Sequence, residues 1–215
     1  MRRLNVGCGQ TPTPGWINYD NALTARFARI PIVPSVLGLL PVLTDLQRSF
    51  LQTAQAKDIR YANAARHIPE TDRSVDVLYT SHMVEHLDRD EAARFLREAR
   101  RVLQPGGILR VAVPNLKGHV EQYLADADGD GFLARVMLTR NRPKSLLEKL
   151  TYMVVGDRHH QWMYDGPSLC GLIASAGFVD VREMPAGETG IPDPGPLDLR
   201  ERSPESVFVE AKNPG

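Results

Sequence analysis

Two stretches of the chain combine residue types that can bind a ligand or move a proton. The first is Asn5-Val6-Gly7-Cys8-Gly9, in which two glycines follow a short apolar run, and Asp20 stands eleven residues after its last glycine. A glycine turn lets a ligand approach the backbone closely, and an acidic side chain at the end of the next strand accepts hydrogen bonds from ribose hydroxyls. The second stretch, residues 156–165, holds two histidines, a tryptophan, a tyrosine and an arginine.

The residues that follow the glycine turn discriminate between nucleotide ligands. A dinucleotide site usually has a third glycine and a helix whose N-terminus holds the pyrophosphate. Here Thr11-Pro12-Thr13-Pro14-Gly15 follows instead, and little room for a helix remains before Asp20. The pattern therefore favours a nucleoside ligand without phosphate, of which S-adenosylmethionine is an example.

The elements that must position these groups alternate between apolar runs and helical patterns. This alternation predicts an α/β fold, with a mostly parallel sheet and helices on both faces. Strands are predicted at Leu4–Gly7, Ile17–Asp20, Ile59–Asn63, Val75–Ser81, Ile108–Pro114, Phe178–Met184 and Ser206–Ala211. Helices are predicted at Arg89–Leu103, with Asp88 and Glu91 at capping-box spacing, and at Ser168–Ala176. Pro105-Gly106-Gly107 is expected to stop the first helix and turn the chain.

Two segments depart from this alternation, residues 22–57 and 117–156. We expect both to be helical insertions in a single domain of residues 1–215, emerging at the carboxyl ends of strands, where open α/β sheets bind ligands. The first insertion is expected to cap the ligand pocket. The alternative is a packing or dimer element, because exposed apolar patches often mark interfaces.

Four ordered motifs resemble the class I, Rossmann-like S-adenosylmethionine-dependent methyltransferases, and among them the methyltransferase type 11 group. They are Leu4–Gly9, Gly15–Asp20, Ser74–Leu87 and Arg101–Gly107. The resemblance implies S-adenosylmethionine as cofactor and methyl transfer to a small-molecule or glycan acceptor, through an oxygen or nitrogen nucleophile. It implies no metal ion. His159 and His160 are adjacent in the sequence, and adjacency alone does not make them a metal-binding pair.

The resemblance also implies which residues bind the cofactor. They are Asn5, Gly7, Cys8, Gly9, Asp20, Asn63, Ala64, Ser81 and His82. Asp20 would bind the ribose, and Asn63 with Ala64 would lie near the adenine. Relatives often carry acidic residues where Asn5 and Asn63 stand, so these amides depart from the pattern. The structural alternatives are a helix cap for Asp20 and simple packing for Cys8.

The stretch of residues 156–165 is predicted to line the acceptor pocket, because it connects the second insertion to the last helix. Trp162 and Tyr164 would bind the substrate by stacking, with His86 as a further contact. The alternative for the two aromatic side chains is a place in the core.

Three histidines are candidate catalytic bases for a hydroxyl acceptor: His160, His159 and His82. An imidazole with an ordinary pKa of about 6.5 can take a proton at neutral pH. The alternative is that these histidines only cap or hydrogen-bond the chain.

Composition narrows the remaining classes. Twenty-six basic residues balance 26 acidic ones, so total charge gives no argument for a nucleic-acid partner or an anionic membrane. The apolar stretch Ile30–Leu43 is too short to span a bilayer and contains three prolines. Two cysteines form no disulfide framework, and a cytoplasmic protein is expected, either monomeric or a homodimer. The rival function is a non-catalytic module that keeps the fold and binds a cofactor or a partner. A nucleotide-dependent oxidoreductase is disfavoured, because this chain lacks the third glycine of the dinucleotide pattern.

Overall fold

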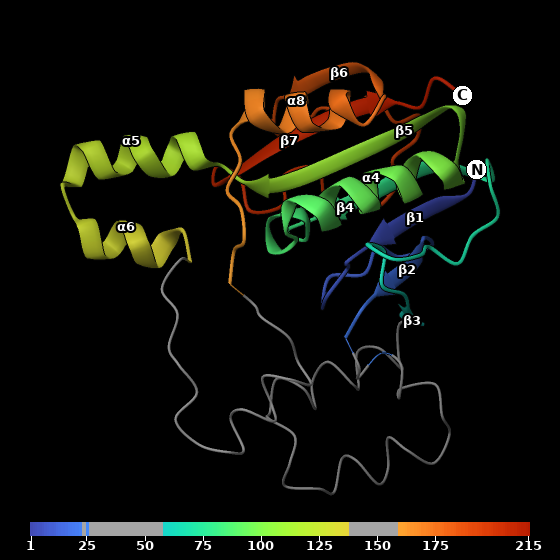
Figure 1. Cartoon of the computed structure of the whole chain (residues 1–215), viewed down its shortest axis with the longest axis horizontal. Coiled ribbons are helices and arrows are strands. Elements are labelled where there is room, and N and C mark those ends of the chain that lie inside the picture. The colour runs from blue at the N-terminus through green and yellow to red at the C-terminus, as the bar shows by residue number, and fades with distance from the viewer. Residues whose placement is uncertain (23–24, 26–57, 138–158) are drawn as a thin grey trace, which may run out of the picture.

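The computed structural model of the chain describes residues 1–22, 25, 58–137 and 159–215. Seven strands form one sheet in the order β3-β2-β1-β4-β5-β7-β6 (Figure 1). The strands are β1 (Arg3–Val6), β2 (Ile17–Asp20), β3 (Arg60–Tyr61), β4 (Val75–Ser81), β5 (Leu103–Pro114), β6 (Val179–Met184) and β7 (Ser206–Lys212). The helices are η1 (Val84–His86), α4 (Arg89–Val102), α5 (Leu116–Asp126), α6 (Gly129–Arg135) and α8 (Gly166–Ser175).

The sheet is parallel except at β7, which runs antiparallel to both β5 and β6. This confirms the predicted mostly parallel α/β fold. Because β1 to β5 share one direction, their carboxyl ends lie at one edge of the sheet. The glycine loop, Asp20 and the residues that follow β4 all lie at that edge.

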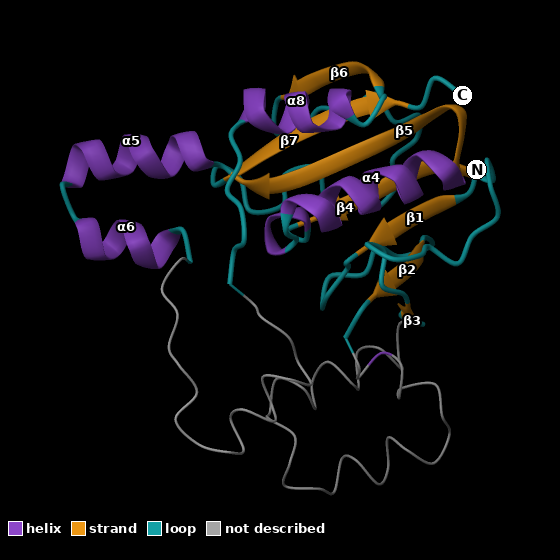
Figure 2. Cartoon of the chain, in the orientation of Figure 1, coloured by secondary structure: helices purple, strands orange, loops and turns teal. Residues whose placement is uncertain are grey.

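The two faces of the sheet are covered differently. Helices α4 and α8 lie across one face, where Phe95 and Ile173 join the apolar side chains of the strands (Figure 2). The other face packs against loop residues, among them Trp16 and Ile191. The prediction of helices on both faces is thus met on one face by α4 and α8, while loops cover the second face in the described part of the chain. The short connection between β1 and β2 has no room for a helix.

Local contacts set the element boundaries, and two of the boundaries differ from the predictions. The capping box of Asp88 and Glu91 begins α4 as predicted. The triplet Pro105-Gly106-Gly107 does not form the expected turn, because β5 already begins at Leu103, which pairs with Val75. The register shift that follows absorbs the triplet as an irregularity within the strand. Helix α8 begins two residues early, because the Asp165 side chain accepts a hydrogen bond from the Ser168 N–H and caps it there.

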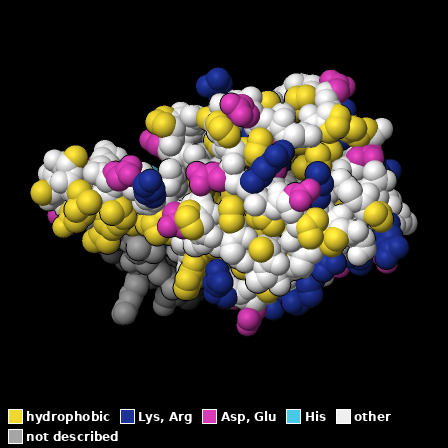
Figure 3. Space-filling view, turned by 90° about the horizontal axis from the view of Figure 1, so that it is seen from above, with side chains coloured by type: hydrophobic (Ala, Val, Ile, Leu, Met, Phe, Trp, Pro, Cys, Tyr) yellow, Lys and Arg dark blue, Asp and Glu magenta, His cyan; other side chains and the backbone are white. Residues whose placement is uncertain are grey.

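The second insertion is helical where the structure describes it. Helices α5 and α6 form a projecting pair (Figure 1), and their exposed apolar side chains gather at that end of the surface (Figure 3). Residues 138–156 of this insertion lie outside the described residues, as does nearly all of the predicted cap at 22–57. None of the helices seen in the described ranges is long and apolar enough to cross a bilayer.

Candidate active site

The loop after β1 places its two glycines in backbone conformations that suit a close approach. Gly7 has φ +72° and Gly9 has φ +50°, in the left-handed region that favours glycine. A Cβ atom at Gly7 would lie 2.5 Å from the Met83 Cγ, whereas one at Gly9 would meet nothing within 4 Å. Gly7 therefore lets the loop pack on the chain that follows β4, and at Gly9 the described residues leave room beside the backbone.

Asp20 fixes this loop against the end of β2. Its Oδ2 accepts a hydrogen bond of 2.9 Å from the Gly9 N–H, and its Oδ1 accepts one of 2.8 Å from the Ala22 N–H. The contact with Ala22 resembles the capping role considered as an alternative. A carboxylate only accepts hydrogen bonds, so the chemistry of Asp20 suits a ligand that carries hydroxyl groups.

Asn5 and Cys8 support the loop from within. Asn5 is buried, and its Nδ2 donates to the Thr13 Oγ1 at 3.0 Å, which holds the chain that leads to β2. Cys8 is also buried, and burial raises the pKa of its thiol far above the ordinary value. The thiol is therefore protonated at neutral pH and unsuited to nucleophilic catalysis.

The other predicted cofactor residues lie at the same edge. Asn63 and Ala64 lie two and three residues after the end of β3, with Ala64 buried and Asn63 partly exposed. Ser81 is the last residue of β4, and His82 comes next with φ +49° and its N–H bonded to the Ala112 carbonyl. Their contact with a cofactor stays a prediction.

A cluster of ionisable side chains surrounds Glu85, which is buried in η1. The Glu85 Oε1 lies 3.3 Å from the His82 Nδ1 and 4.0 Å from the His86 Nε2. The ring of His160 packs edge-on against that of His86, with 5.1 Å between centroids. The fold thus brings three predicted site residues, His82, His86 and His160, close to Glu85, although His160 is more than 70 residues further along the chain. We call these four residues the histidine cluster (His82, Glu85, His86 and His160).

Backbone hydrogen bonds hold the two parts of the histidine cluster together. The Glu85 carbonyl accepts from the N–H groups of Gln161 and Trp162, at 2.7 and 3.1 Å. Sequence reasoning missed Glu85, although an acidic residue three positions after one histidine and directly before another was a usable signal. Burial lowers the pKa of His160 from its ordinary value, which keeps its imidazole neutral at pH 7.

The remaining predicted acceptor residues lie in different surroundings. Trp162 is 46% exposed, and the Arg89 guanidinium lies 4.9 Å from its ring centroid. His159 is partly exposed, and its carbonyl oxygen lies 3.3 Å from the His86 Nδ1. Tyr164 is fully buried in the hydrophobic core, because its backbone pairs with the chain at Asn115 and turns the ring inward. Its ring is therefore a core element here and offers no surface for stacking.

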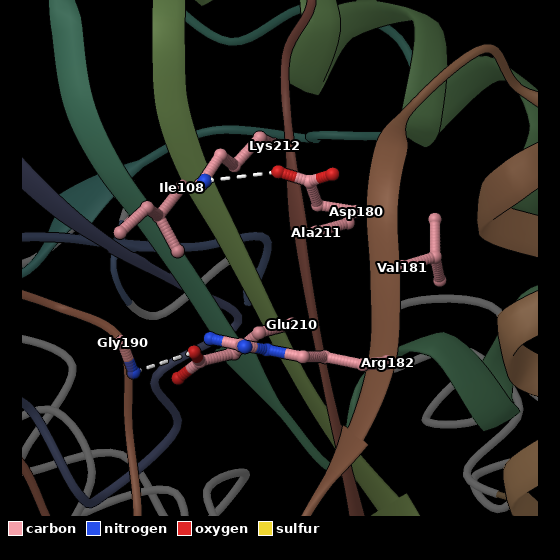
Figure 4. Close-up of a pocket in the computed structure, with 8 residues that line it drawn as sticks. All are labelled: Ile108, Asp180, Val181, Arg182, Gly190, Glu210, Ala211 and Lys212. Atoms are coloured by element: carbon pink, nitrogen blue, oxygen red, sulfur yellow. Dashed lines mark hydrogen bonds and ion pairs between the residues drawn. The ribbon is translucent and has the colours of Figure 1, made fainter.

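A separate cavity of about 450 Å³ lies among β5, β6 and β7 (Figure 4). Ile108, Arg182, Glu210 and Lys212 are among its lining residues. Because Ile108 belongs to the amino-terminal half of β5, this cavity lies away from the carboxyl edge. None of the predicted site residues lines it.

The sequence model of a family described as a methyltransferase domain matches residues 4–111, half of the chain. The chain belongs to this methyltransferase domain family. The match ends within β5 and includes the glycine loop, Asp20 and η1, so it covers the candidate cofactor site. The predicted family is confirmed.

Two curated relatives of the chain agree with this. One is a probable S-adenosylmethionine-dependent methyltransferase from Mycolicibacterium smegmatis, 34% identical over 52% of this chain and 37% of the relative. Another is the methyltransferase GfsG from Streptomyces halstedii, 29% identical over 77% of this chain and 58% of the relative. The chain thus spans between about a third and three fifths of the length of these relatives.

Solved structures share the fold at low identity. A putative methyltransferase of Haloferax volcanii, in complex with the activator Trm112, has a TM-score of 0.52 at 14% identity, covering 100% of this chain and 82% of that one. An S-adenosylmethionine-dependent methyltransferase from Methanosarcina mazei has a TM-score of 0.52 at 16% identity, covering 98% and 91%. These likenesses confirm the predicted Rossmann-like fold.

Proposed function

We propose that the protein transfers a methyl group from S-adenosylmethionine to an oxygen or nitrogen atom of a small-molecule or glycan acceptor. The observation that carries the proposal is the hydrogen bond between Asp20 and Gly9, within the region matched by the methyltransferase family. It places a carboxylate beside a stretch of backbone at Gly9 where the described residues leave room for a ligand. A ribose and the methionine part of the cofactor fit such a pair of surfaces.

The connection between β1 and β2 supports a ligand without phosphate. Residues 10–16 form turns and irregular backbone without a helix, so no helix N-terminus stands behind Gly9 to bind a pyrophosphate. This favours S-adenosylmethionine over a dinucleotide. When bound, S-adenosylmethionine supplies a methyl group on a positively charged sulfur, which is a good leaving group.

The residues of the chain then have to position the acceptor. Its nucleophilic atom must stand about 3–3.5 Å from the methyl carbon, with water excluded. Asp20 holds the ribose in place. His86 and Trp162, which lie beyond the carboxyl end of β4, bind the acceptor. A hydroxyl acceptor also needs a base, and we propose His82, His159 or His160 for this role.

Asp20→Ala is expected to weaken S-adenosylmethionine binding. Loss of two hydrogen bonds to a charged acceptor amounts to roughly 1.5–3 kcal/mol, or ~10–150-fold in Kd. Calorimetric titration measures the change, and Asp180→Ala on β6 is the matched control, which should bind like the parent protein. Equal affinity in Asp20→Ala would remove Asp20 from the cofactor site.

His159→Ala and His160→Ala, made separately, test the proposed base. Cofactor affinity is expected to stay unchanged in both, and turnover of a hydroxyl acceptor is expected to fall ~10²-fold or more in one of them. Labelled-methyl transfer and calorimetry give the two readouts. Normal turnover in both variants would leave His82 as the remaining candidate, and cofactor binding without any transfer would favour the non-catalytic module.

The expectations about oligomeric state, nucleic-acid partners and cellular location stay predictions. The exposed apolar residues of α5 and α6 support the homodimer considered from the sequence, with Val120 and Leu124 on α5 and Leu133 on α6. Light scattering of the purified protein measures this directly. A cytoplasmic location and a lack of nucleic-acid partners remain expectations from composition.

A further inference from the structure

We propose that Glu85, His86 and His160 bind a divalent transition-metal ion, with Zn²⁺ as the reference ion. Each of the three side chains offers one ligand atom, and these atoms all lie within 4.8 Å of one another. The sequence predicted no metal ion, because the adjacent pair of histidines at 159 and 160 has no ligand spacing. The fold instead pairs His160 with residues of η1, far away in the chain. This inference does not depend on methyl transfer. A metal-bound His160 has no lone pair left to take a proton, so with the ion bound the proposed base is His82 or His159.

The carboxylate of Glu85 is the first observation that points to a cation. Its side chain is 1% exposed, and neither oxygen accepts a hydrogen bond from the residues that the structure describes. Its nearest recorded partners are imidazoles, His82 at 3.3 Å and His86 at 4.0 Å. A buried carboxylate without hydrogen bonds is strongly unfavourable, and a bound cation removes that penalty.

The hydrogen bonds of the two histidines are the second observation. The Nδ1 of His160 lies 3.0 Å from the Val136 carbonyl oxygen, and the Nδ1 of His86 lies 3.3 Å from that of His159. A carbonyl oxygen can only accept, so each Nδ1 carries the hydrogen and each Nε2 keeps its lone pair. Metal-binding histidines are oriented in this way, with the distal N–H held by a backbone carbonyl.

His82 completes the surroundings of Glu85 as an outer partner. Its Nδ1 contacts Glu85, while its Nε2 lies 3.0 Å from the Ser206 Oγ. The Nε2 of His82 is therefore occupied by Ser206, in contrast to the Nε2 atoms of His86 and His160. This arrangement fixes the orientation of the Glu85 side chain, as partners of metal-binding carboxylates do.

The set of two imidazoles and one carboxylate suits Zn²⁺ and related first-row ions. With metal–ligand bonds of 2.0–2.2 Å, tetrahedral ligand atoms lie about 3.3 Å apart, so the three side chains have to close by at most about 1.5 Å. Three protein ligands leave a fourth position for water or an acceptor oxygen. The ion would also link η1 to the chain at His160.

An exposed pair elsewhere provides a matched control. The Nδ1 of His67 lies 3.1 Å from Glu98, but the His67 side chain is 64% exposed. Glu98 already accepts hydrogen bonds from Arg101 and from the Ile68 N–H. The Glu98 carboxylate is therefore already paired with the Arg101 guanidinium and hydrogen-bonded, and we expect no metal there.

The test uses the full chain without a polyhistidine tag, after treatment with EDTA and removal of the chelator. Zn²⁺ is titrated in competition with a chromophoric chelator, and Co²⁺ binding is followed by visible d–d absorption. We expect one ion per chain and a Co²⁺ spectrum of low coordination number. Glu85→Gln, His86→Ala and His160→Ala are each expected to lower the affinity at least ~10-fold, and His67→Ala is expected to leave it unchanged.

Circular dichroism of each variant keeps the result interpretable. His86 is partly exposed, so His86→Ala should fold even where a buried substitution does not. Absence of stoichiometric Zn²⁺ binding by the parent protein, or full binding by folded His86→Ala, would overturn the metal site. Calorimetry with S-adenosylmethionine on the metal-free protein keeps this outcome separate from failure of the proposed methyl transfer.

Discussion

Arg110→Met is expected to lower the free energy of unfolding by about 3–5 kcal/mol. Arg110 on β5 lies opposite Glu210 on β7, and its Nη1 lies 2.6 Å from the Glu210 Oε1. The two side chains are 0% and 4% exposed. Removal of the guanidinium leaves a buried carboxylate without its counter-ion, which is worse for stability than removal of both charges.

A double-mutant cycle with denaturant unfolding tests this ion pair. Arg110→Met combined with Glu210→Leu is expected to destabilise the protein by less than the sum of the two single changes. Lys212→Met is the matched control, because Lys212 pairs with the exposed Asp180 at the edge of the same sheet. That substitution should produce no measurable change. Wild-type stability of Arg110→Met would show that the carboxylate is solvated or neutral.

Gly7→Ala is expected to lower S-adenosylmethionine affinity by ~10²-fold or more. Alanine at φ +72° costs roughly 1–2 kcal/mol, and its Cβ would lie 2.5 Å from the Met83 Cγ and 2.8 Å from the Met83 Cβ. The Met83 Cβ is tied to the backbone, so a rotamer change cannot relieve this contact. Overpacking of this kind adds about 1–3 kcal/mol, and the loop must move from the position that we propose binds the cofactor.

Gly15→Ala separates the two contributions in the same titration. Gly15 has φ +75°, but a Cβ there would meet nothing within 4 Å. It therefore carries the left-handed penalty without the clash, and it lies beyond the glycine loop. We expect Gly15→Ala to bind cofactor like the parent protein, with a slightly lower melting temperature. Unchanged affinity in Gly7→Ala would contradict the role of the close contact with Met83.

Features determined by neighbouring residues could be predicted from the sequence. The capping box of Asp88 and Glu91 depends on two residues three positions apart, and the short β2 that ends at Asp20 is a segment of four residues. The parallel sheet follows from the order of such elements. The family resemblance follows from four motifs, each of which is a short continuous segment of the chain.

Features determined by distant partners could not be predicted in the same way. Whether Tyr164 faces a substrate or the core depends on its pairing with the end of β5, and Pro105-Gly106-Gly107 joins a strand because Asn213 provides a partner for Gly106. Glu85 gained importance only when the fold placed His160 next to η1. The ion pair of Arg110 and Glu210 likewise requires two strands that are a hundred residues apart.

The single turn of η1 lies between the glycine loop and the segment that contains Trp162. Met83, immediately before η1, packs under Gly7, and the carbonyl of Glu85 within it holds the backbone of Gln161 and Trp162. A shift of this turn would alter the glycine loop, proposed to bind the cofactor, and the segment proposed to bind the acceptor together. Thermodynamic linkage then requires that an acceptor which repositions the turn changes cofactor affinity, and that cofactor changes acceptor affinity by the same factor. Reciprocal cooperativity between the two ligands is therefore an expected property of this connection.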